Sequence, residues 1–173
     1  REFQIKKIRA DLNFKFIRGN VDTRIKKLNE GLYDAIILSY AGIKSLEIEE
    51  KITEVFSTNE IIPSAGQGII ALQCRDNDNE IISLLDRIND KETFLRAQAE
   101  RNVLKVLEGD CETAVGAYAF IEKDILTLEA ELFSLDGTQR FYEKKSCKLE
   151  NVEELGNEVG TILKTKSNNT YKK

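Results

Sequence analysis

Hydrophobic residues recur at every third or fourth position between Lys91 and Leu107, and this spacing predicts a long amphipathic helix. Asp90 has the side chain of an N-cap, and Gly109 suits the left-handed residue that closes a helix. The apolar positions are Phe94, Leu95, Ala99, Val103, Val106 and Leu107. Charged residues fall between them, at Arg96, Glu100, Arg101 and Lys105.

Beyond this helix the period changes from the helical one to strict alternation. Strands are predicted at 113–121, 125–134 and 139–145, and Asp136-Gly137 is a hairpin turn between the last two. The alternation predicts a sheet with one face in water. A last helix then packs against the sheet, and the polar tail 164–173 is expected to fray. The apolar positions of that helix are Val152, Leu155, Val159 and Ile162.

The first half of the chain has the pattern of a β-α-β unit. Strands are predicted at 11–17 and at 35–39, where a continuous apolar run is typical of a strand covered on both faces. The helix 21–29 lies between them, with Asn20 as its N-cap and Gly31 at its end. This order favours a parallel sheet with a right-handed crossover.

Three further elements are predicted before the long helix. Residues 47–56 form an amphipathic helix, 69–73 a buried strand and 79–88 a short helix. The segment 61–68 contains the single proline and two closely spaced glycines, so it is the expected hinge. The chain therefore divides near residue 90 into a β-α-β half and an α+β domain.

Composition excludes several classes of protein. The net charge is -4, with 26 basic and 30 acidic residues mixed along the chain, so we expect neither nucleic acid nor membrane as a partner. No apolar run reaches the roughly 18 to 20 residues that cross a bilayer, so we expect a cytoplasmic protein. The chain has no methionine and begins abruptly at Arg1, which indicates a fragment.

The residue types limit the chemistry further. Because the chain has no histidine, Ser-His-Asp catalysis, Cys-His catalysis and histidine metal sites are excluded within it. Cysteines 74, 111 and 147 are odd in number and widely spaced, so neither a disulfide framework nor a zinc site is expected.

Cys111 lies at the junction between the long helix and the first strand of the sheet. It follows the negative end of a helix dipole and lies between Asp110 and Glu112, all of which disfavour a thiolate. A cysteine that is alkylated once by a strong electrophile fits this environment better than a fast nucleophile does. The alternative is a small, partly buried structural thiol in a turn.

The arginines suggest a site for carboxylates. Arg18 and Arg24 bracket the start of a helix, whose free N–H groups already favour an anion. Arg75 follows a predicted buried strand, at the end of a sheet where α/β proteins bind ligands, and Arg1 is a further candidate. Arginine binds a carboxylate through two parallel hydrogen bonds. The alternative for each is a solvated surface charge.

Taken together, these stretches resemble the porphobilinogen deaminase family, also called hydroxymethylbilane synthases. The match to the family's second domain runs through Arg18-Gly-Asn-Val-Asp-Thr-Arg24, Gly31-Leu-Tyr-Asp-Ala-Ile-Ile-Leu38 and Ala41-Gly42. Pro63-Ser-Ala-Gly-Gln-Gly68 resembles the inter-domain segment. The cofactor loop is matched by Ala99-Glu100-Arg101, Leu107-Glu-Gly-Asp-Cys111 and Val115-Gly-Ala-Tyr118.

The resemblance implies a fold of the α/β plus α+β class. Residues 1–62 would be a periplasmic-binding-protein-like β-α-β domain, and 63–68 the hinge. Residues 69–88 would be a strand and helix of an absent first domain. Residues 89–173 would be a small C-terminal domain of three antiparallel strands packed with helices, which carries the cofactor.

The resemblance also implies a transferase of haem and tetrapyrrole synthesis. The family joins four porphobilinogen units into hydroxymethylbilane with loss of ammonia, on a dipyrromethane cofactor held through a thioether by the cysteine that matches Cys111. By the same match, cofactor-binding residues are Arg1, Arg18, Arg24 and Gln67. Substrate-binding residues are Arg18, Arg24 and Arg75.

The family's catalytic aspartate belongs to its first domain, so no catalytic residue and no metal ligand are expected in this chain. The expected partners are porphobilinogen and the missing N-terminal domain of the same protein, and the full-length enzyme is expected to be a monomer. The chain alone is expected to be inactive.

Two other functions remain open. The arginines would equally suit a non-catalytic module that binds a small dicarboxylate, and Cys111 would suit a thiol redox protein. A redox role needs a low thiol pKa, which the acidic neighbours oppose. Measuring the intact mass distinguishes the enzyme from the binding module. The enzyme is expected to carry a dipyrromethane adduct, and the binding module is expected to have a free thiol.

Overall fold

The alternating pattern beyond residue 113 forms the antiparallel sheet that it predicts. The structure is a computed structural model that describes residues 1–108 and 113–172. In it, β1 (Val115–Glu122), β2 (Ile125–Phe133) and β3 (Arg140–Lys148) pair in the order β1-β2-β3. All three strand predictions are confirmed, although β3 continues to Lys148 instead of ending at 145.

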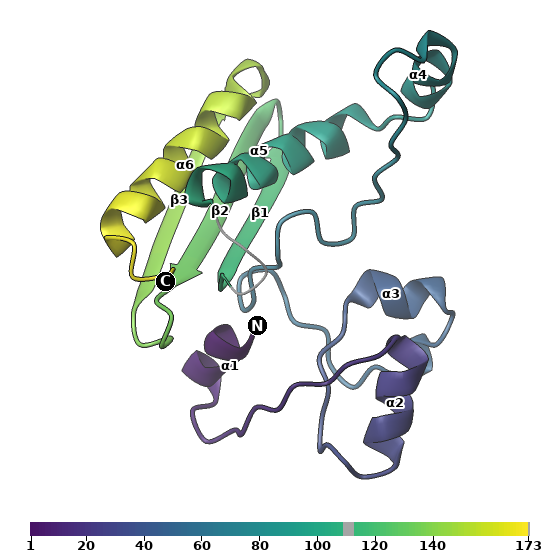
Figure 1. Cartoon of the computed structure of the whole chain (residues 1–173), viewed down its shortest axis with the longest axis vertical. Helices are drawn as coiled ribbons and strands as arrows, with labels where there is room; N and C mark the ends of the chain where they lie inside the picture. The colour runs from purple at the N-terminus through teal and green to yellow at the C-terminus, as the bar shows by residue number, and fades with distance from the viewer. Residues whose placement is uncertain (109–112, 173) are drawn as a thin grey trace. The chain divides into compact units, whose positions relative to one another are not determined.

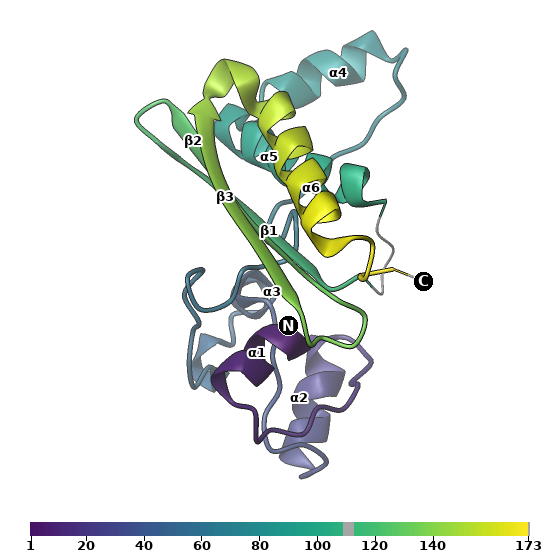
Figure 2. The same ribbon diagram turned by 90° about the vertical axis from the view of Figure 1, so that its left-hand side faces the viewer.

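Two long helices cover one face of this sheet (Figure 1 and Figure 2). α5 (Lys91–Leu107) packs on β1, and α6 (Val152–Ser167), which follows the short 3-10 helix η2 (Leu149–Asn151), packs on β3. The Asp90 side chain accepts a hydrogen bond from the Thr93 N–H, as predicted for an N-cap. The core between helices and sheet includes Ala99, Val103, Leu107, Leu126, Leu128, Leu132, Val159 and Leu163.

The face of β2 that points away from α5 and α6 is buried, although the alternating pattern predicted that this face is exposed to solvent. Glu129 and Glu131 are buried there, because side chains of the neighbouring strand β3 cover them. The Arg140 Nε donates to the Glu131 Oε2 at 2.7 Å, and the Lys144 Nζ lies 2.5 Å from the Glu129 Oε1. Buried carboxylates require such partners, since an unpaired charge is costly to remove from water.

The turn between β2 and β3 is held by the Asp136 carboxylate. Its Oδ1 accepts hydrogen bonds from the Ser134 Oγ at 2.6 Å and from the Thr138 N–H at 3.0 Å, and these bonds lower its pKa to about 2. Gly137 has a φ of +72°, which glycine adopts without strain.

The ionised Asp136 is therefore expected to make the stability of this unit pH-dependent in acid. Because its pKa is lower in the folded chain than in the unfolded chain, its contribution is present above about pH 4 and is lost as the pH falls through about 2. An Asp136→Asn variant keeps an acceptor oxygen but cannot titrate. Urea denaturation followed by circular dichroism gives the free energy of unfolding at each pH from 5 to 2. This free energy should fall less steeply with decreasing pH in the variant than in the parent chain. Equal pH dependence in the two chains would contradict the role of Asp136.

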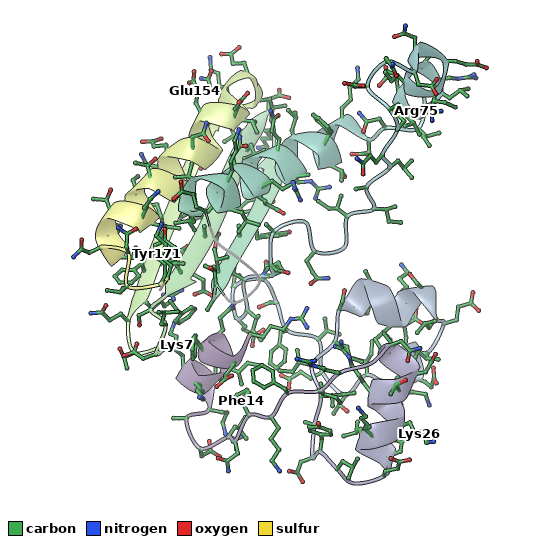
Figure 3. All side chains as sticks on the ribbon, in the orientation of Figure 1. Lys7, Phe14, Lys26, Arg75, Glu154 and Tyr171 are labelled. Carbon is green, nitrogen blue, oxygen red and sulfur yellow. The ribbon has the colours of Figure 1, made fainter. Side chains whose placement is uncertain are left out.

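The C-terminal tail is ordered up to Lys172, so the prediction that it frays is wrong. Tyr171 is 1% exposed, and its hydroxyl donates to the Leu107 carbonyl oxygen at 2.8 Å. The Leu135 N–H donates to the Thr170 carbonyl oxygen at 2.9 Å. Figure 3 shows Tyr171 beside the end of α6. A single buried aromatic ring anchors a segment that is otherwise polar.

The segment between the hinge and α5 forms its helix but not its strand. α4 (Asn79–Asp86) lies apart from the sheet and has no buried residue (Figure 1). The predicted strand at 69–73 is not formed, and Ile70 in it is 89% exposed. A strand needs a neighbour for its backbone groups, and no described segment pairs with this one.

The chain falls into two compact units, one formed by Glu2–Ser57 and the other by Arg1 with Thr58–Lys173. The first contains α1 (Glu2–Ile8), α2 (Val21–Asn29), α3 (Tyr40–Ser45) and the 3-10 helix η1 (Glu49–Lys51). The Asn20 Oδ1 accepts from the Thr23 N–H at 2.9 Å, which confirms the predicted N-cap of α2.

The predicted strands of this first unit are not formed. Residues 11–17 and 35–39 have no strand pairing, and Phe16 is 96% exposed. The expected helix at 47–56 shrinks to the one turn of η1, because Glu47 has a φ of +55° and Ile52 is extended. The parallel sheet expected for 1–62 is therefore absent from the described residues, which hold one antiparallel sheet with helices.

Within residues 1–108 and 113–172, no helix is both long enough and apolar enough to cross a membrane.

Candidate functional site

The expected hinge segment, α5 and β1 surround a cavity of about 160 Å³. Gln67, a residue predicted to bind the cofactor, lines it, together with Arg96 and Glu100 of α5 and Tyr118 of β1. All of these residues belong to the same compact unit.

The hinge segment is bound along the edge of β1. The Ala117 N–H donates to the Pro63 carbonyl oxygen at 2.9 Å. Gly116 allows this approach, because a Cβ at that position would lie 2.8 Å from the Ile62 carbonyl oxygen. A tight turn follows, in which the Gln67 N–H donates to the Ser64 carbonyl oxygen at 3.0 Å.

Glu100 is the charged group at the centre of this arrangement. It is 4% exposed, and its two oxygens accept hydrogen bonds from the Gly66 N–H at 2.7 Å and the Ala119 N–H at 2.8 Å. Burial raises the pKa of this carboxyl group, and the two hydrogen bonds act in the opposite direction. The helical pattern placed Glu100 among the charged residues of α5 and gave no sign that it is buried.

Two predicted cofactor-binding residues lie together beside this segment. The Arg1 Nη2 donates to the Gln67 Oε1 at 3.0 Å, and the Ser64 Oγ donates to the same oxygen at 3.2 Å. The guanidinium of Arg1 thus has a fixed partner on the turn that lines the cavity.

Arg18 and Arg24 lie at the start of α2, as predicted. The Arg24 Nε donates to the Gly19 carbonyl oxygen at 2.8 Å, and the Lys27 Nζ donates to the Arg18 carbonyl oxygen at 2.9 Å. These bonds fold the cationic side chains back onto the turn that precedes the helix. Two cationic side chains, Arg24 and Lys27, are thus held at the turn before one helix N-terminus, a location that favours anions.

Arg75 lies beside α4 (Figure 3). Its Nη2 is 3.6 Å from the Asp78 Oδ2, and its side chain is 84% exposed. Asp78 also caps α4 by accepting from the Ile81 N–H. The described contacts of Arg75 are thus those of a surface ion pair.

Cys111 lies outside the described residues, as does Gly109, but the chain on both sides of 109–112 is anchored. The residue that ends α5 within the described part is Glu108, which adopts a left-handed φ of +52°. The Glu108 carboxylate accepts hydrogen bonds from Lys164 and Lys172, which lower its pKa. On the other side of 109–112, the Ala114 carbonyl oxygen accepts from the Phe133 N–H at 3.0 Å.

The other two cysteines are free thiols. Burial, and secondarily the charge of Glu154, raise the pKa of Cys147 and so keep its thiol protonated. Among the described residues, no group of three acidic, cysteine or histidine side chains could hold a metal ion.

Two family models match the chain in sequence order. The model described as porphobilinogen deaminase, dipyromethane cofactor binding domain, matches residues 1–83, and the model described as porphobilinogen deaminase, C-terminal domain, matches residues 94–165. The chain belongs to the porphobilinogen deaminase family.

Curated porphobilinogen deaminases confirm the match and are about twice as long as the part of them that aligns with this chain. The chain is 40% identical over 156 residues to that of Blochmanniella pennsylvanica (strain BPEN) and 43% identical over 162 residues to that of Exiguobacterium sibiricum. These alignments cover 90% and 92% of the chain but 52% of each relative. The chain spans about half the length of the curated relatives it matches.

The candidate site residues divide between the two porphobilinogen deaminase models. Cys111 lies in the part matched by the C-terminal-domain model. The part matched by the cofactor-binding-domain model contains Arg1, Arg18, Arg24, Gln67 and Arg75.

Proposed function

We propose that this chain is the cofactor-carrying part of a porphobilinogen deaminase, the transferase that joins four porphobilinogen units into hydroxymethylbilane with release of ammonia. The observation that carries the proposal is the succession of two family models along one chain, over residues 1–83 and 94–165. The cofactor is dipyrromethane, attached through a thioether to Cys111.

The residues present suit such a cofactor. Dipyrromethane carries acetate and propionate side chains, and the cationic start of α2 supplies guanidiniums that bind carboxylates in pairs of hydrogen bonds. The connection that holds Cys111 begins and ends at residues anchored to α6 and to β2. A covalently bound group needs an attachment point of this kind, because its position is then set by the fold.

The chemistry of attachment requires one alkylation of Cys111. The sulfur forms a bond to the methylene carbon of porphobilinogen, the bond from that carbon to the amine breaks, and the amine leaves as ammonia with the proton of the thiol. Because the thioether is permanent, Cys111 needs no depressed pKa for repeated turnover. Once bound, the dipyrromethane supplies the primer on which the growing pyrrole chain is assembled.

We assign Arg1, Arg18, Arg24 and Gln67 to binding the cofactor, and Arg18, Arg24 and Arg75 to binding the acidic side chains of the substrate. Residues 1–62 are proposed to join a periplasmic-binding-protein-like domain in the complete enzyme, in which the segments 11–17 and 35–39 would be strands. The exposed apolar segment 69–88 is proposed to complete the first domain, which also holds the catalytic aspartate.

The chain alone is proposed to be inactive, with the N-terminal domain of the same protein as its required partner. The support is its length, which is about half that of the relatives. The complete enzyme is proposed to be a cytoplasmic monomer.

The proposal predicts a covalent adduct that depends on a single sulfur. The chain should be produced together with its N-terminal domain in cells that make porphobilinogen, incubated with further porphobilinogen, denatured and weighed intact. We expect a mass increase of two porphobilinogen units less two ammonia molecules, and its complete loss in Cys111→Ser. Cys147→Ser is the matched control and should keep the adduct, because Cys147 is a partly buried free thiol within β3 and not the proposed attachment point.

Two outcomes of this measurement would contradict the proposal. An unmodified parent chain would favour the module that binds a small dicarboxylate. An adduct that persists in Cys111→Ser would place the attachment at another residue.

A further inference from the structure

β1 is an edge strand of the sheet, so half of its backbone N–H groups point away from β2. Unpaired groups of this kind invite pairing with another chain unless other partners cover them. In this structure two consecutive outward N–H groups are covered by different parts of the chain. The Ala117 N–H donates to the Pro63 carbonyl oxygen, and the Ala119 N–H donates to the Glu100 Oε1 at 2.8 Å.

The second oxygen of the same carboxylate binds the hinge segment. The Glu100 Oε2 accepts from the Gly66 N–H at 2.7 Å, and Gly66 adopts a φ of +72°. One side chain therefore joins three elements that are far apart in sequence, namely α5, β1 and the segment 63–68. Together with the bond from Ala117 to Pro63, it fixes that segment at two points along the edge of β1.

Because the Glu100 carboxylate is buried, both of its hydrogen bonds must be kept. A carboxylate that is 4% exposed is stabilised only while both of its hydrogen-bond donors stay in place. Conversely, an apolar side chain at position 100 would leave two buried N–H groups without an acceptor, which is unfavourable for each of them. Arg96, on the same helix, lines the same cavity and favours the charged form of Glu100.

We propose that Glu100 is a positioning residue whose carboxylate holds the segment 63–68, and with it the Gln67 that binds Arg1, at the edge of β1. Gln67 follows Gly66 directly, and its Oε1 receives the Arg1 guanidinium at 3.0 Å. The placement of this pair thus depends on the bond between Glu100 and Gly66. The proposal concerns the chain itself and does not require the cofactor.

Amide hydrogen exchange measured by NMR on the whole chain tests this directly. In Glu100→Ala, exchange of the Gly66 and Ala119 amides should accelerate by about tenfold to a hundredfold relative to the core amides of Leu128 and Val159, as expected for loss of a hydrogen bond to a charged acceptor. In Glu100→Gln, whose side chain offers one acceptor oxygen, one of the two amides should keep its protection and the other should lose it.

Glu129 provides the matched control, because it is also a buried glutamate of this unit, at 7% exposed, but bonds to Tyr142 and Lys144. Glu129→Ala and Glu129→Gln should leave the relative exchange of the Gly66 and Ala119 amides unchanged. The proposal is overturned if those amides in the Glu100 variants exchange at the parental rate, or accelerate only in proportion to Leu128 and Val159. If Glu100→Ala does not fold, the exchange rates of the Gly66 and Ala119 amides in Glu100→Gln test the proposal, since glutamine preserves the size of the side chain.

Discussion

Replacing Gly156 with alanine is expected to destabilise the unit that contains the sheet by about 3 kcal/mol, a large share of the stability of a small domain. Gly156 lies where α6 crosses α5 at close range. A Cβ at this position would lie 2.5 Å from the Ala99 carbonyl oxygen and 2.7 Å from the Asn102 Cβ. The first of these atoms is backbone, so the two helices would have to separate.

The same substitution at Gly42 is the matched control, because that glycine is also helical but has space around it. The nearest atom to a Cβ there is the Val21 Cγ2, at an ordinary 3.9 Å. Because alanine favours a helix more than glycine does, Gly42→Ala is expected to be neutral or to stabilise the chain by up to about 1 kcal/mol. Urea denaturation followed by circular dichroism measures both variants. Equal midpoints for Gly156→Ala and the parent would show that the helices do not cross as described.

Replacing Tyr171 with alanine is expected to cost about 3 to 5 kcal/mol, as for other fully buried aromatic residues. The Tyr171 ring belongs to the core, and its hydroxyl satisfies the Leu107 carbonyl oxygen at the end of α5. The variant loses both contributions. It also releases Lys172, which binds Glu108, three residues before Cys111 in the sequence.

Tyr171→Phe separates the ring from its hydroxyl. It keeps the packing and leaves one buried carbonyl oxygen unsatisfied, so a loss of only about 1 kcal/mol is expected. Urea denaturation again provides the measurement. If Tyr171→Ala were no less stable than Tyr171→Phe, the tail would not be packed as described and would fray as the sequence predicted.

The sequence predicted the C-terminal sheet and helices well because their stability is local. The alternation in β2 and the three-to-four spacing in α5 each have a partner within the next few dozen residues, so the pattern is satisfied inside the chain. The segments 11–17, 35–39 and 69–73 are also apolar, but they do not belong to the sheet that the described residues form. A pattern predicts a strand only where a neighbour exists to pair with it.

Motifs pointed to some of the candidate residues, whereas the burial of others left no trace in the sequence. Gln67 and Arg1 were assigned from resemblance, and the structure joins them by one hydrogen bond. Glu100 belongs to a matched motif, but nothing in the sequence indicated that it is buried, since a charged residue on a helix is usually exposed. Tyr171 was missed for a related reason, because one aromatic residue among polar neighbours shows no periodicity from which its burial follows.

The central claim is that the sulfur of Cys111 is the attachment point of a dipyrromethane group, and one peptide mass tests it most directly. Trypsin should release residues Val106 to Lys123 as a peptide with Cys111 as its one cysteine. After the chain has been produced and incubated with its N-terminal domain and porphobilinogen, we expect this peptide to be heavier by two porphobilinogen units less two ammonia molecules. The added mass should survive reduction with excess thiol, as a thioether does. An unmodified Val106 to Lys123 peptide, or an added mass that thiol removes, would contradict the account.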